Sequence, residues 1–326
     1  MAAYFLRRLG QSLLAVIAMA ALVFVGVYAI GNPIDILISP DATENDRLQT
    51  IARLGLDRPL WEQFFSYFGN LLRGDFGNSF VFGDSAMSVI LQRLPATMEL
   101  ALLALLLAIV IGVPLGVLAG LYPDSIGGRS IMAGSILGFS LPNFWQGLML
   151  ILIFGVYLGW LPSGGRGPTT ELFGIRVSFL SLEGLKYMVL PSINLALFKM
   201  ALVIRLARAG TREVMMQDYI KFARAKGLSR SRLVTVHVLK NIMIPIVTVL
   251  GLELGSMIAF AVITETVFSW PGMGKLLIDS INRLDRPVIV AYLMLIVVIF
   301  VIINFLVDLL YSALDPRVRL MQRGAQ

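Results

Sequence analysis

The sequence contains no cysteine and a single histidine among its 326 residues. Without cysteine, the chain can form neither a disulfide framework nor a cysteine zinc site. With His237 as its only histidine, it cannot complete a metal site built on histidine ligands. Charged residues are also scarce, at 14% of the chain against about 25% in an ordinary soluble domain. These absences exclude a disulfide-stapled protein, a cysteine- or histidine-based metalloprotein and an ordinary soluble domain.

Several catalytic signatures are missing as well. The sequence has no H-E-x-x-H motif of zinc proteases and no G-x-S-x-G motif of serine hydrolases. It also lacks the phosphate-binding G-x-x-x-x-G-K-[ST] loop, because Gly274-Lys275 is followed by Leu276. The chain therefore has no evident means of binding ATP by itself. We expect its energy source to be a partner subunit or an ion gradient.

Apolar residues dominate the chain, at 57% of the total. About 20 consecutive apolar residues suffice to span a bilayer as a helix, and six segments approach or exceed this length. They are 9–30, 100–122, 131–160, 187–207, 242–264 and 288–311. The first could be a signal peptide with Ala18-Met19-Ala20 as its cleavage site. Because its apolar run continues past that site, we favour a retained helix. The sequence thus predicts an all-α, polytopic membrane protein with six transmembrane helices.

The charges of the connecting segments are distributed unevenly. The N-terminus, 123–129, 205–240 and the C-terminus together carry 15 Lys and Arg residues and 4 acidic ones. The segments 31–96, 160–186 and 264–287 carry 11 Lys and Arg residues and 13 acidic ones. Cytoplasmic loops are enriched in Lys and Arg. The pattern predicts cytoplasmic N- and C-termini, and it favours this membrane role over nucleic-acid binding.

The segment 205–241 is a polar stretch between the fourth and fifth apolar segments. Residues 212–226 contain good helix formers and no proline, and Gly227 follows as a C-terminal stop. Ser229 is placed to cap a second, basic helix that leads into the fifth span. On this pattern alone two interpretations stay open. The segment is either a basic loop on anionic lipid headgroups or a helix offered to a cytoplasmic partner.

The same segment carries Asp218-Tyr219-Ile220 and Ala223-Arg224-Ala225-Lys226-Gly227-Leu228, followed by His237, Asn241 and Pro245. Further short motifs follow one order along nearly the whole chain: LGLDRP at 54–59, LLRGDFG at 71–77, RLPAT at 93–97, LPNFW at 141–145, GWLP at 159–162, ETVF at 265–268, WPGMG at 270–274 and LDPR at 314–317. Together they resemble the permeases of ABC importers, most closely the dipeptide/oligopeptide/nickel branch of the binding-protein-dependent family. The segment 205–241 is then similar to the family's EAA loop. One departure is that Lys221-Phe222 precede Ala223, where the general motif begins Glu-Ala-Ala.

The resemblance implies a type I ABC importer permease in the bacterial inner (cytoplasmic) membrane. Its implied partners are a second homologous permease, two ATPase subunits that bind ATP and Mg, and a periplasmic or lipid-anchored substrate-binding protein. No cofactor is then expected in this chain itself. The implied coupling residues toward the ATPases are Asp218, Tyr219, Phe222, Ala223, Arg224, Ala225, Gly227 and Leu228.

The organisation expected from these observations has four parts. Residues 1–30 form an N-terminal tail and the first span, and 31–96 form a large periplasmic loop. Residues 97–311 form the permease core of spans two to six with the EAA-like loop 205–241, and 312–326 form a cytoplasmic tail. The loop 31–96 contains an aromatic stretch around Trp61 and Phe65, for which receipt of the binding protein and simple interfacial anchoring both stay open.

Lys199 and Glu253 are ionisable residues at membrane depth, and Glu265 lies near the end of a span. Ionisable groups there are costly, so they usually face a cavity or each other. Three roles stay open for Lys199 and Glu253: a structural pair, substrate-path residues, or snorkelling and partner-subunit contacts. We name Lys199, Glu253 and Glu265 as candidate translocation-path residues.

Peptides are the substrates that the resemblance favours, while nickel, opines and oligosaccharides fit the same architecture. An ion-coupled secondary carrier is a weaker alternative. It would need intramembrane acids, and the sequence shows no internal repeat of the kind common in such carriers.

Overall fold

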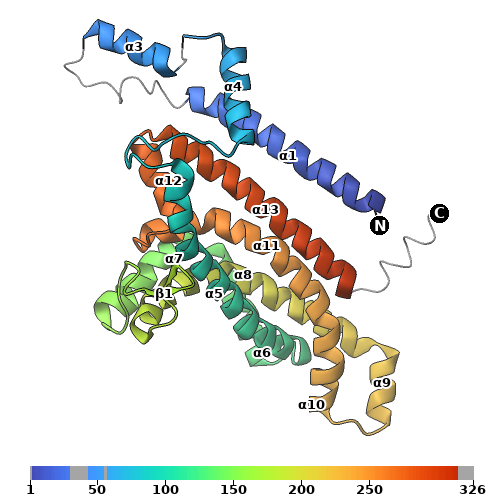
Figure 1. The fold of residues 1–326 in the computed structure, drawn as a ribbon. Helices are drawn as coiled ribbons and strands as arrows, with labels where there is room; N and C mark the ends of the chain where they lie inside the picture. Colours follow the sequence, from blue (N-terminus) through green and yellow to red (C-terminus); the bar gives the residue numbers. More distant parts are fainter. Residues whose placement is uncertain (1, 30–42, 55–56, 315–326) are drawn as a thin grey trace. The chain divides into compact units, whose positions relative to one another are not determined.

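The computed structural model describes residues 2–29, 43–54 and 57–314, and helices account for most of this part of the chain (Figure 1). In chain order, the elements are α1 (Ala2–Ala29), α3 (Glu44–Leu54), α4 (Leu60–Leu72), α5 (Ala86–Leu121), α6 (Ile126–Ser140), α7 (Asn143–Leu150), the π-helical turn η1 (Ile151–Tyr157), β1 (Thr170–Leu172), β2 (Ile175–Val177), α8 (Leu182–Met216), α9 (Asp218–Ala225), α10 (Arg230–Arg232), the π-helical turn η2 (Leu233–Val238), α11 (Leu239–Val267), α12 (Met273–Asn282) and α13 (Arg286–Leu314).

The predicted apolar segments fall on α1, α5, the α6–α7 pair, α8, α11 and α13. Within the described residues, four helices are long and apolar enough to cross a membrane: Ala86–Leu121, Leu182–Met216, Arg230–Val267 and Arg286–Leu309. The apolar stretch described in α1, Gly10–Gly26, is shorter. The prediction of an all-α, polytopic membrane fold is confirmed.

The third predicted span is not one straight helix. α6 and the α7–η1 segment are bent by 108° at a short break. At this break Leu141 adopts an extended conformation (φ −82°, ψ 138°) just before Pro142. A residue that precedes proline avoids the helical region, and proline offers no backbone N–H. The sequence motif LPNFW therefore ends one helix and starts another within the apolar run.

The chain divides into two compact units, Met1–Leu94 with Gly272–Val301, and Pro95–Pro271 with Ile302–Gln326. In the first unit, α4 packs along α1, where the ring centroids of Phe24 and Phe64 lie 5.2 Å apart. The opposite side of α4 leaves Trp61 and Phe65 exposed. α4 thus carries the aromatic stretch of 31–96 on an amphipathic helix, and the two roles considered for that stretch stay predictions.

In the second unit, α5 and α8 pack closely through the glycines of α5. A Cβ atom added at Gly116 would lie 2.6 Å from the Cβ of Ala207, and one at Gly120 would lie 2.7 Å from the Cβ of Thr211. Such distances are too short for any side chain. The glycines at four-residue spacing therefore let the two backbones approach.

Two other details of the second unit concern a pair of glycines and a tryptophan. Gly134 and Gly138 of α6 repeat the same spacing, but an added Cβ atom would meet no described atom within 4 Å. The segment 268–272 forms a turn in which Trp270 is fully buried and donates from Nε1 to the carbonyl oxygen of Ala96 at 2.9 Å. Trp270 is therefore an internal contact of this unit and not an anchor at the membrane surface.

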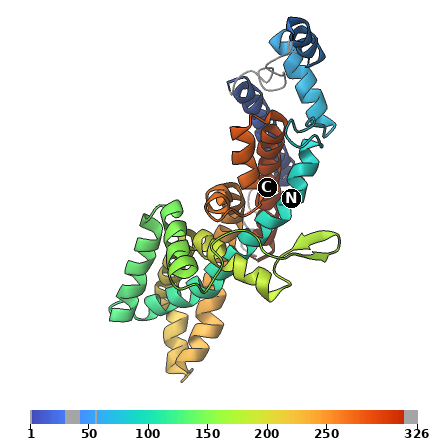
Figure 2. The same cartoon turned by 90° about the vertical axis from the view of Figure 1, so that its left-hand side faces the viewer.

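The short antiparallel hairpin of β1 and β2 precedes α8 and projects away from the helices of its unit (Figure 2). Its turn consists of Phe173 and Gly174, both with positive φ, and the Phe173 side chain is 96% exposed. α9 follows the other end of α8. With 35 residues, α8 separates the hairpin from α9 by about 50 Å at 1.5 Å per residue.

Candidate functional site

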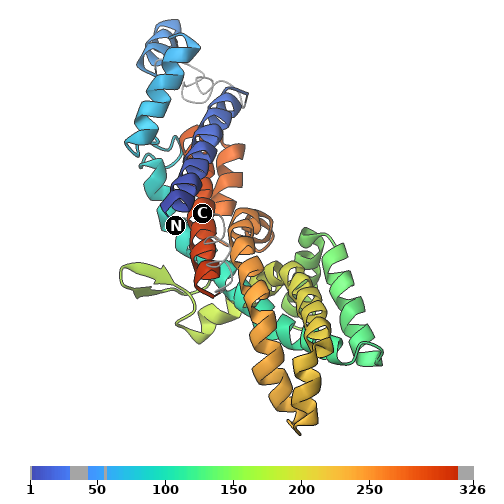
Figure 3. The same cartoon turned by 90° about the vertical axis from the view of Figure 1, so that its right-hand side faces the viewer.

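The segment 205–241 forms a helical hairpin in which α9 lies beside the α10–η2 segment (Figure 3). The prediction of one helix over 212–226 is wrong, because residues 212–216 belong to α8. Gln217 breaks the helix in an extended conformation (φ −67°, ψ 145°), and its N–H donates to the carbonyl oxygen of Val214. Asp218 then opens α9, where a carboxylate interacts favourably with the free N–H groups of a helix N-terminus.

The turn of the hairpin matches the sequence analysis. Gly227 adopts a left-handed conformation (φ +80°), which costs glycine little and other residues more. Ser229 caps the next helical turn, because its side chain accepts a hydrogen bond from the N–H of Arg232 at 3.4 Å. The predicted stop at Gly227 and the predicted cap at Ser229 are confirmed.

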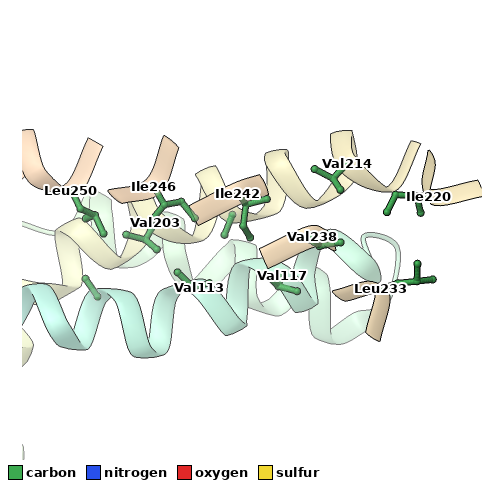
Figure 4. Close-up of a cluster of buried hydrophobic side chains, with 12 residues drawn as sticks. Val113, Val117, Val203, Val214, Ile220, Leu233, Val238, Ile242, Ile246 and Leu250 are labelled. Atoms are coloured by element: carbon green, nitrogen blue, oxygen red, sulfur yellow. The ribbon is translucent and has the colours of Figure 1, made fainter. Parts of the chain in front are cut away.

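The hairpin is attached to the membrane-spanning helices by one apolar cluster (Figure 4). Ile220 of α9 is fully buried, and it joins Leu233 and Val238 of η2 in this cluster. The same cluster contains Val113 and Val117 of α5. Its remaining buried members come from α5, α8 and α11: Ala108, Val203, Ala207, Val214, Ile242, Ile246 and Leu250. α9 therefore packs directly on α8 and η2, and the cluster connects it through them to α5 and α11.

The predicted coupling residues separate into an inner and an outer set. Ala223 and Leu228 pack partly buried against the apolar cluster. The outer set is exposed and consists of Asp218, Tyr219, Phe222, Arg224, Ala225 and Gly227. Phe222 is 62% exposed and carries Lys226 Nζ 4.6 Å above its ring. α9 thus presents a mixed aromatic and basic face away from the cluster.

Two residues that follow the loop motif hold the exposed tyrosine. Asn241 Nδ2 donates to the hydroxyl of Tyr219 at 3.1 Å and to the carbonyl oxygen of His237 at 2.6 Å. The ring of His237 lies 6.3 Å from that of Tyr219. The single histidine of the chain thus lies beside the tyrosine, on η2. Within the described residues, no group of three or more His, Cys, Asp or Glu residues is arranged to hold a metal ion.

A second group of polar residues lies within the helices. Lys199 of α8 and Glu253 of α11 form an ion pair, in which Lys199 Nζ contacts Glu253 Oε2. Lys199 Nζ also donates to Ser256 Oγ at 3.0 Å, and Ser256 Oγ donates to Glu253 Oε2 at 2.8 Å. The two ionisable residues singled out from the sequence are therefore brought together.

This ion pair lines a cavity of about 630 Å³. The wall is formed by residues of α6, α7, α8 and α11 and of the break between α6 and α7: Phe139, Ser140, Leu141, Pro142, Asn143, Gln146, Asn194, Leu195, Phe198, Lys199, Glu253, Ser256, Met257 and Phe260. All of them belong to the second compact unit. Most of the wall area is apolar, although seven of the fourteen residues have polar side chains.

The bend between α6 and α7 is stabilised beside this cavity by Gln146. Its Nε2 donates to the carbonyl oxygens of Gly138 and Leu141, both at 2.8 Å. A helix that ends leaves carbonyl groups without partners in the helix, and Gln146 satisfies two of them at this point. The bend is therefore a fixed part of the cavity wall.

Glu265, the third candidate for the path, does not line this cavity. It is fully buried near the end of α11, and it accepts a hydrogen bond from Thr97 Oγ1 at 2.5 Å. The structure thus groups Lys199 with Glu253 and places Glu265 elsewhere in the same unit.

Sequence reasoning missed two polar clusters of this unit. Asn194 Nδ2 donates to Asn143 Oδ1 at 2.6 Å and to Thr264 Oγ1 at 3.0 Å, which ties α7, α8 and α11 together. Glu99 forms a buried ion pair with Arg166 at 3.1 Å. A polar residue inside an apolar run is a usable signal for Asn194. No spacing in the sequence links Glu99 to Arg166.

Comparisons with known proteins place these features in context. Residues 112–320 match the family model described as "Binding-protein-dependent transport system inner membrane component", and residues 1–101 match the model of the corresponding N-terminal region. A crystal structure of the MetNI methionine ABC transporter in inward-facing conformations contains a chain with a similar fold. The TM-score is 0.55 at 18% sequence identity, with 70% of this chain and 97% of that chain covered.

Curated relatives match over almost the full length. The di/tripeptide transport system permease protein DppB of Pseudomonas aeruginosa is 38% identical, with 98% of this chain and 99% of the relative covered. The dipeptide transport system permease protein DppB of Escherichia coli K12 is 37% identical, with 97% and 98% covered. The oligopeptide transport system permease protein AppB of Bacillus subtilis is 38% identical, with 98% and 99% covered.

Proposed function

We propose that this chain, which belongs to the family of binding-protein-dependent transport system inner membrane components, is the permease subunit of an ATP-driven importer of di- and oligopeptides. As a family member it is a multi-pass inner-membrane transport protein and not an enzyme. One observation carries the peptide assignment. Three relatives named for dipeptides, di/tripeptides and oligopeptides match along nearly the whole chain at 37–38% identity.

In the proposed assembly, this chain pairs with a second homologous permease. Two ATPase subunits bind and hydrolyse ATP with Mg, and a periplasmic or lipid-anchored binding protein delivers the peptide. No cofactor is assigned to this chain. The absence of a phosphate-binding loop from the sequence supports the division of labour, because the energy must then come from another subunit.

The proposed orientation places α9 and both termini in the cytoplasm and the β1–β2 hairpin in the periplasm. The length of α8 supports it, since this helix separates the hairpin from α9 by about 50 Å, more than a hydrocarbon core of about 30 Å. The charge distribution supports it as well, because the segment around α9 is strongly basic.

The proposed docking element for the ATPases is α9, with Tyr219, Phe222 and Arg224 on its outer face. Ile220 on its inner face is continuous with the apolar cluster of α5, α8 and α11. A movement of the docked ATPases would thus reach these helices through packed side chains. Alternating access needs such rigid-body movement between two stable arrangements.

The test is a mild-detergent pull-down of the tagged chain, together with dipeptide uptake into proteoliposomes that contain the complete transporter and its binding protein. Two matched variants each replace an exposed phenylalanine with aspartate. Phe222→Asp lies on α9, which follows α8, and Phe173→Asp lies in the hairpin that precedes α8. Neither side chain is buried, at 62% and 96% exposure.

We expect the wild type to co-purify with a second permease and ATPase chains and to take up dipeptide only with ATP. The Phe222→Asp variant should lose the ATPase chains, whereas Phe173→Asp should keep them. A wild type that purifies alone and moves solute without ATP would favour the ion-coupled carrier instead. Retention of the ATPases by Phe222→Asp, with normal uptake, would remove the docking role from this face.

A further inference from the structure

We infer that the cavity lined by Lys199 and Glu253 is a binding site, within the permease itself, for the free ammonium and carboxylate groups of a short peptide. This inference rests on the proposed function as a peptide importer and adds a site to it. It assigns Lys199 to the carboxylate of the peptide and Glu253 to its ammonium group.

The size and lining of the cavity suit a small peptide. Ligand pockets typically measure about 300–1,000 Å³ and combine apolar walls with a few placed polar groups, and this cavity measures about 630 Å³. Phe139 and Phe198 stack with their ring centroids 4.6 Å apart and form part of the apolar wall. Phe260, at 69% exposure, forms another part. An apolar wall of this kind accepts peptide side chains of different shapes.

The ion pair itself retains capacity for a ligand. A lysine ammonium has three N–H donors, and Lys199 directs hydrogen bonds to Glu253 and Ser256. The carboxylate of Glu253 accepts its hydrogen bonds at Oε2, while no hydrogen bond reaches its Oε1 from the described part of the chain. The Glu253 side chain is also 31% exposed. Both side chains can therefore form a hydrogen bond to a ligand without first breaking one of their existing hydrogen bonds.

The contrast with the other ion pair of this unit is informative. Glu99 is 4% exposed, and its Oε1 accepts from the N–H of Ser178 while its Oε2 pairs with Arg166. Arg166 donates in addition to Ser178 Oγ and to the carbonyl oxygen of Arg176. That pair uses both carboxylate oxygens and several backbone groups, as expected of a structural contact. The Lys199–Glu253 pair has no such set of partners.

Charge balance explains why such a site would prefer a zwitterion. The cavity wall carries one positive and one negative side chain, Lys199 and Glu253, which neutralise each other. A free peptide brings one charge of each sign, so each protein charge gains an opposite partner and the site stays neutral. A peptide blocked at one end would bring a single charge and leave this partly buried site with a net charge, which is unfavourable.

Asn194 adds a polar group at the same wall. It is 1% exposed, its Nδ2 is used by Asn143 and Thr264, and its Oδ1 is buried without a hydrogen-bond partner among the described residues. A buried acceptor without a partner is unfavourable. A peptide N–H group is a donor of the right kind for this oxygen.

The experiment uses the complete transporter in nanodiscs, without the binding protein, and measures equilibrium binding of radiolabelled dialanine. Unlabelled dialanine, N-acetyl-dialanine and dialanine amide serve as competitors. The test variant Lys199→Met/Glu253→Gln removes both charges at once, so that no unpaired charge is left to unfold the protein. The control variant Lys275→Met/Asp279→Asn removes the ion pair of α12, which does not line the cavity.

We expect saturable binding of dialanine to the wild type and the control variant, with each blocked peptide competing at least about tenfold more weakly. In Lys199→Met/Glu253→Gln, dialanine should bind at least about tenfold more weakly than in the wild type and no better than the blocked peptides. Wild-type affinity in that variant, equal competition by blocked peptides, or no saturable binding to the wild type would overturn the site.

Uptake measurements separate this inference from the proposed function. With the binding protein and ATP present, proteoliposomes containing the wild type should accumulate dialanine, and those containing Lys199→Met/Glu253→Gln should accumulate it several-fold more slowly. Equal uptake by both would overturn the cavity site and leave the peptide importer standing. No uptake of any peptide by the wild type would overturn the proposed function.

Discussion

α8 has two very different surroundings along its length. Toward α5 it is packed so closely that a methyl group added at Gly116 would collide with Ala207. Toward α6 and α7 it lines the cavity, and a Cβ atom added at Gly134 or Gly138 of α6 would meet no described atom within 4 Å. We call the tightly packed side of α8 that faces α5 the closed side, and the side that borders the cavity the open side.

The two ion pairs of the unit follow the same division. Glu99 of α5 and Arg166 lie in a network in which several polar atoms have partners. Lys199 and Glu253 border the cavity and keep capacity for further contacts. The difference fits the roles proposed above, in which the α5 side moves as a rigid body and the cavity side binds the substrate.

The largest expected effect comes from breaking the pair on the closed side. Arg166→Met would leave Glu99 as an unpaired charge with 4% of its side chain exposed, at a cost of about 3–5 kcal/mol. We expect the purified variant to lose folded protein and to melt at a much lower temperature in detergent. Arg176→Met, on the exposed side of the hairpin, is the control and should melt like the wild type. Equal melting temperatures of both variants would mean that the Glu99–Arg166 pair does not stabilise the fold.

A smaller effect is expected from filling the contact between α5 and α8. In Gly116→Val the new side chain would meet Ala207 and the backbone of Ile204 at 2.6 Å, and overpacking of this kind costs about 1–3 kcal/mol. Gly134→Val is the matched change on α6, where the space is open. The melting temperature should fall for the first variant only. A similar fall for both would erase the distinction between the two sides of α8.

Tyr219→Phe should have a modest effect on the local stability of α9. It removes the hydroxyl that accepts from Asn241, and a hydrogen bond of this kind contributes about 0.5–1.5 kcal/mol. Tyr157→Phe, at an 85% exposed site, is the control. The readout is hydrogen exchange of the α9 amides, which should speed up in the Tyr219 variant alone. Unchanged exchange would show that Asn241 does not help to hold α9.

The smallest change in stability is expected on the open side. Replacement of a whole ion pair by uncharged residues is often neutral or stabilising, so Lys199→Met/Glu253→Gln should melt at or above the wild-type temperature. The same thermal assay as for Arg166→Met applies. A large loss of stability in this double variant would mean that both ion pairs stabilise the fold, so that the two sides of α8 do not differ in this respect.

Much of this fold is predictable from the sequence, because long apolar runs permit few structures in a bilayer. The runs at 187–207, 242–264 and 288–311 correspond to parts of α8, α11 and α13. The turn at Gly227 and the cap at Ser229 also follow from local chemistry, since each depends on one residue and its nearest neighbours. Local signals of this kind are complete within the sequence.

Other features depend on contacts between distant residues. The 108° bend at Leu141-Pro142 needs Gln146 to satisfy carbonyl groups, and hydropathy alone gives a single span there. Glu99 and Arg166 are 67 residues apart, and only the folded chain brings them together. The pairing of Lys199 with Glu253 was foreseen as one of several roles, because two costly charges at membrane depth have few alternatives. The roles assigned to the coupling residues and the path residues stay predictions.

The apolar cluster under α9 has a consequence for engineering. Ile220, Leu233 and Val238 belong to the same apolar cluster as Val113 and Val117 of α5, so the hairpin is not a detachable adaptor. A hairpin grafted from another transporter would carry side chains that pack against a different set of residues. To exchange this hairpin between two transporters, the cluster residues of α5 would thus have to be exchanged with it.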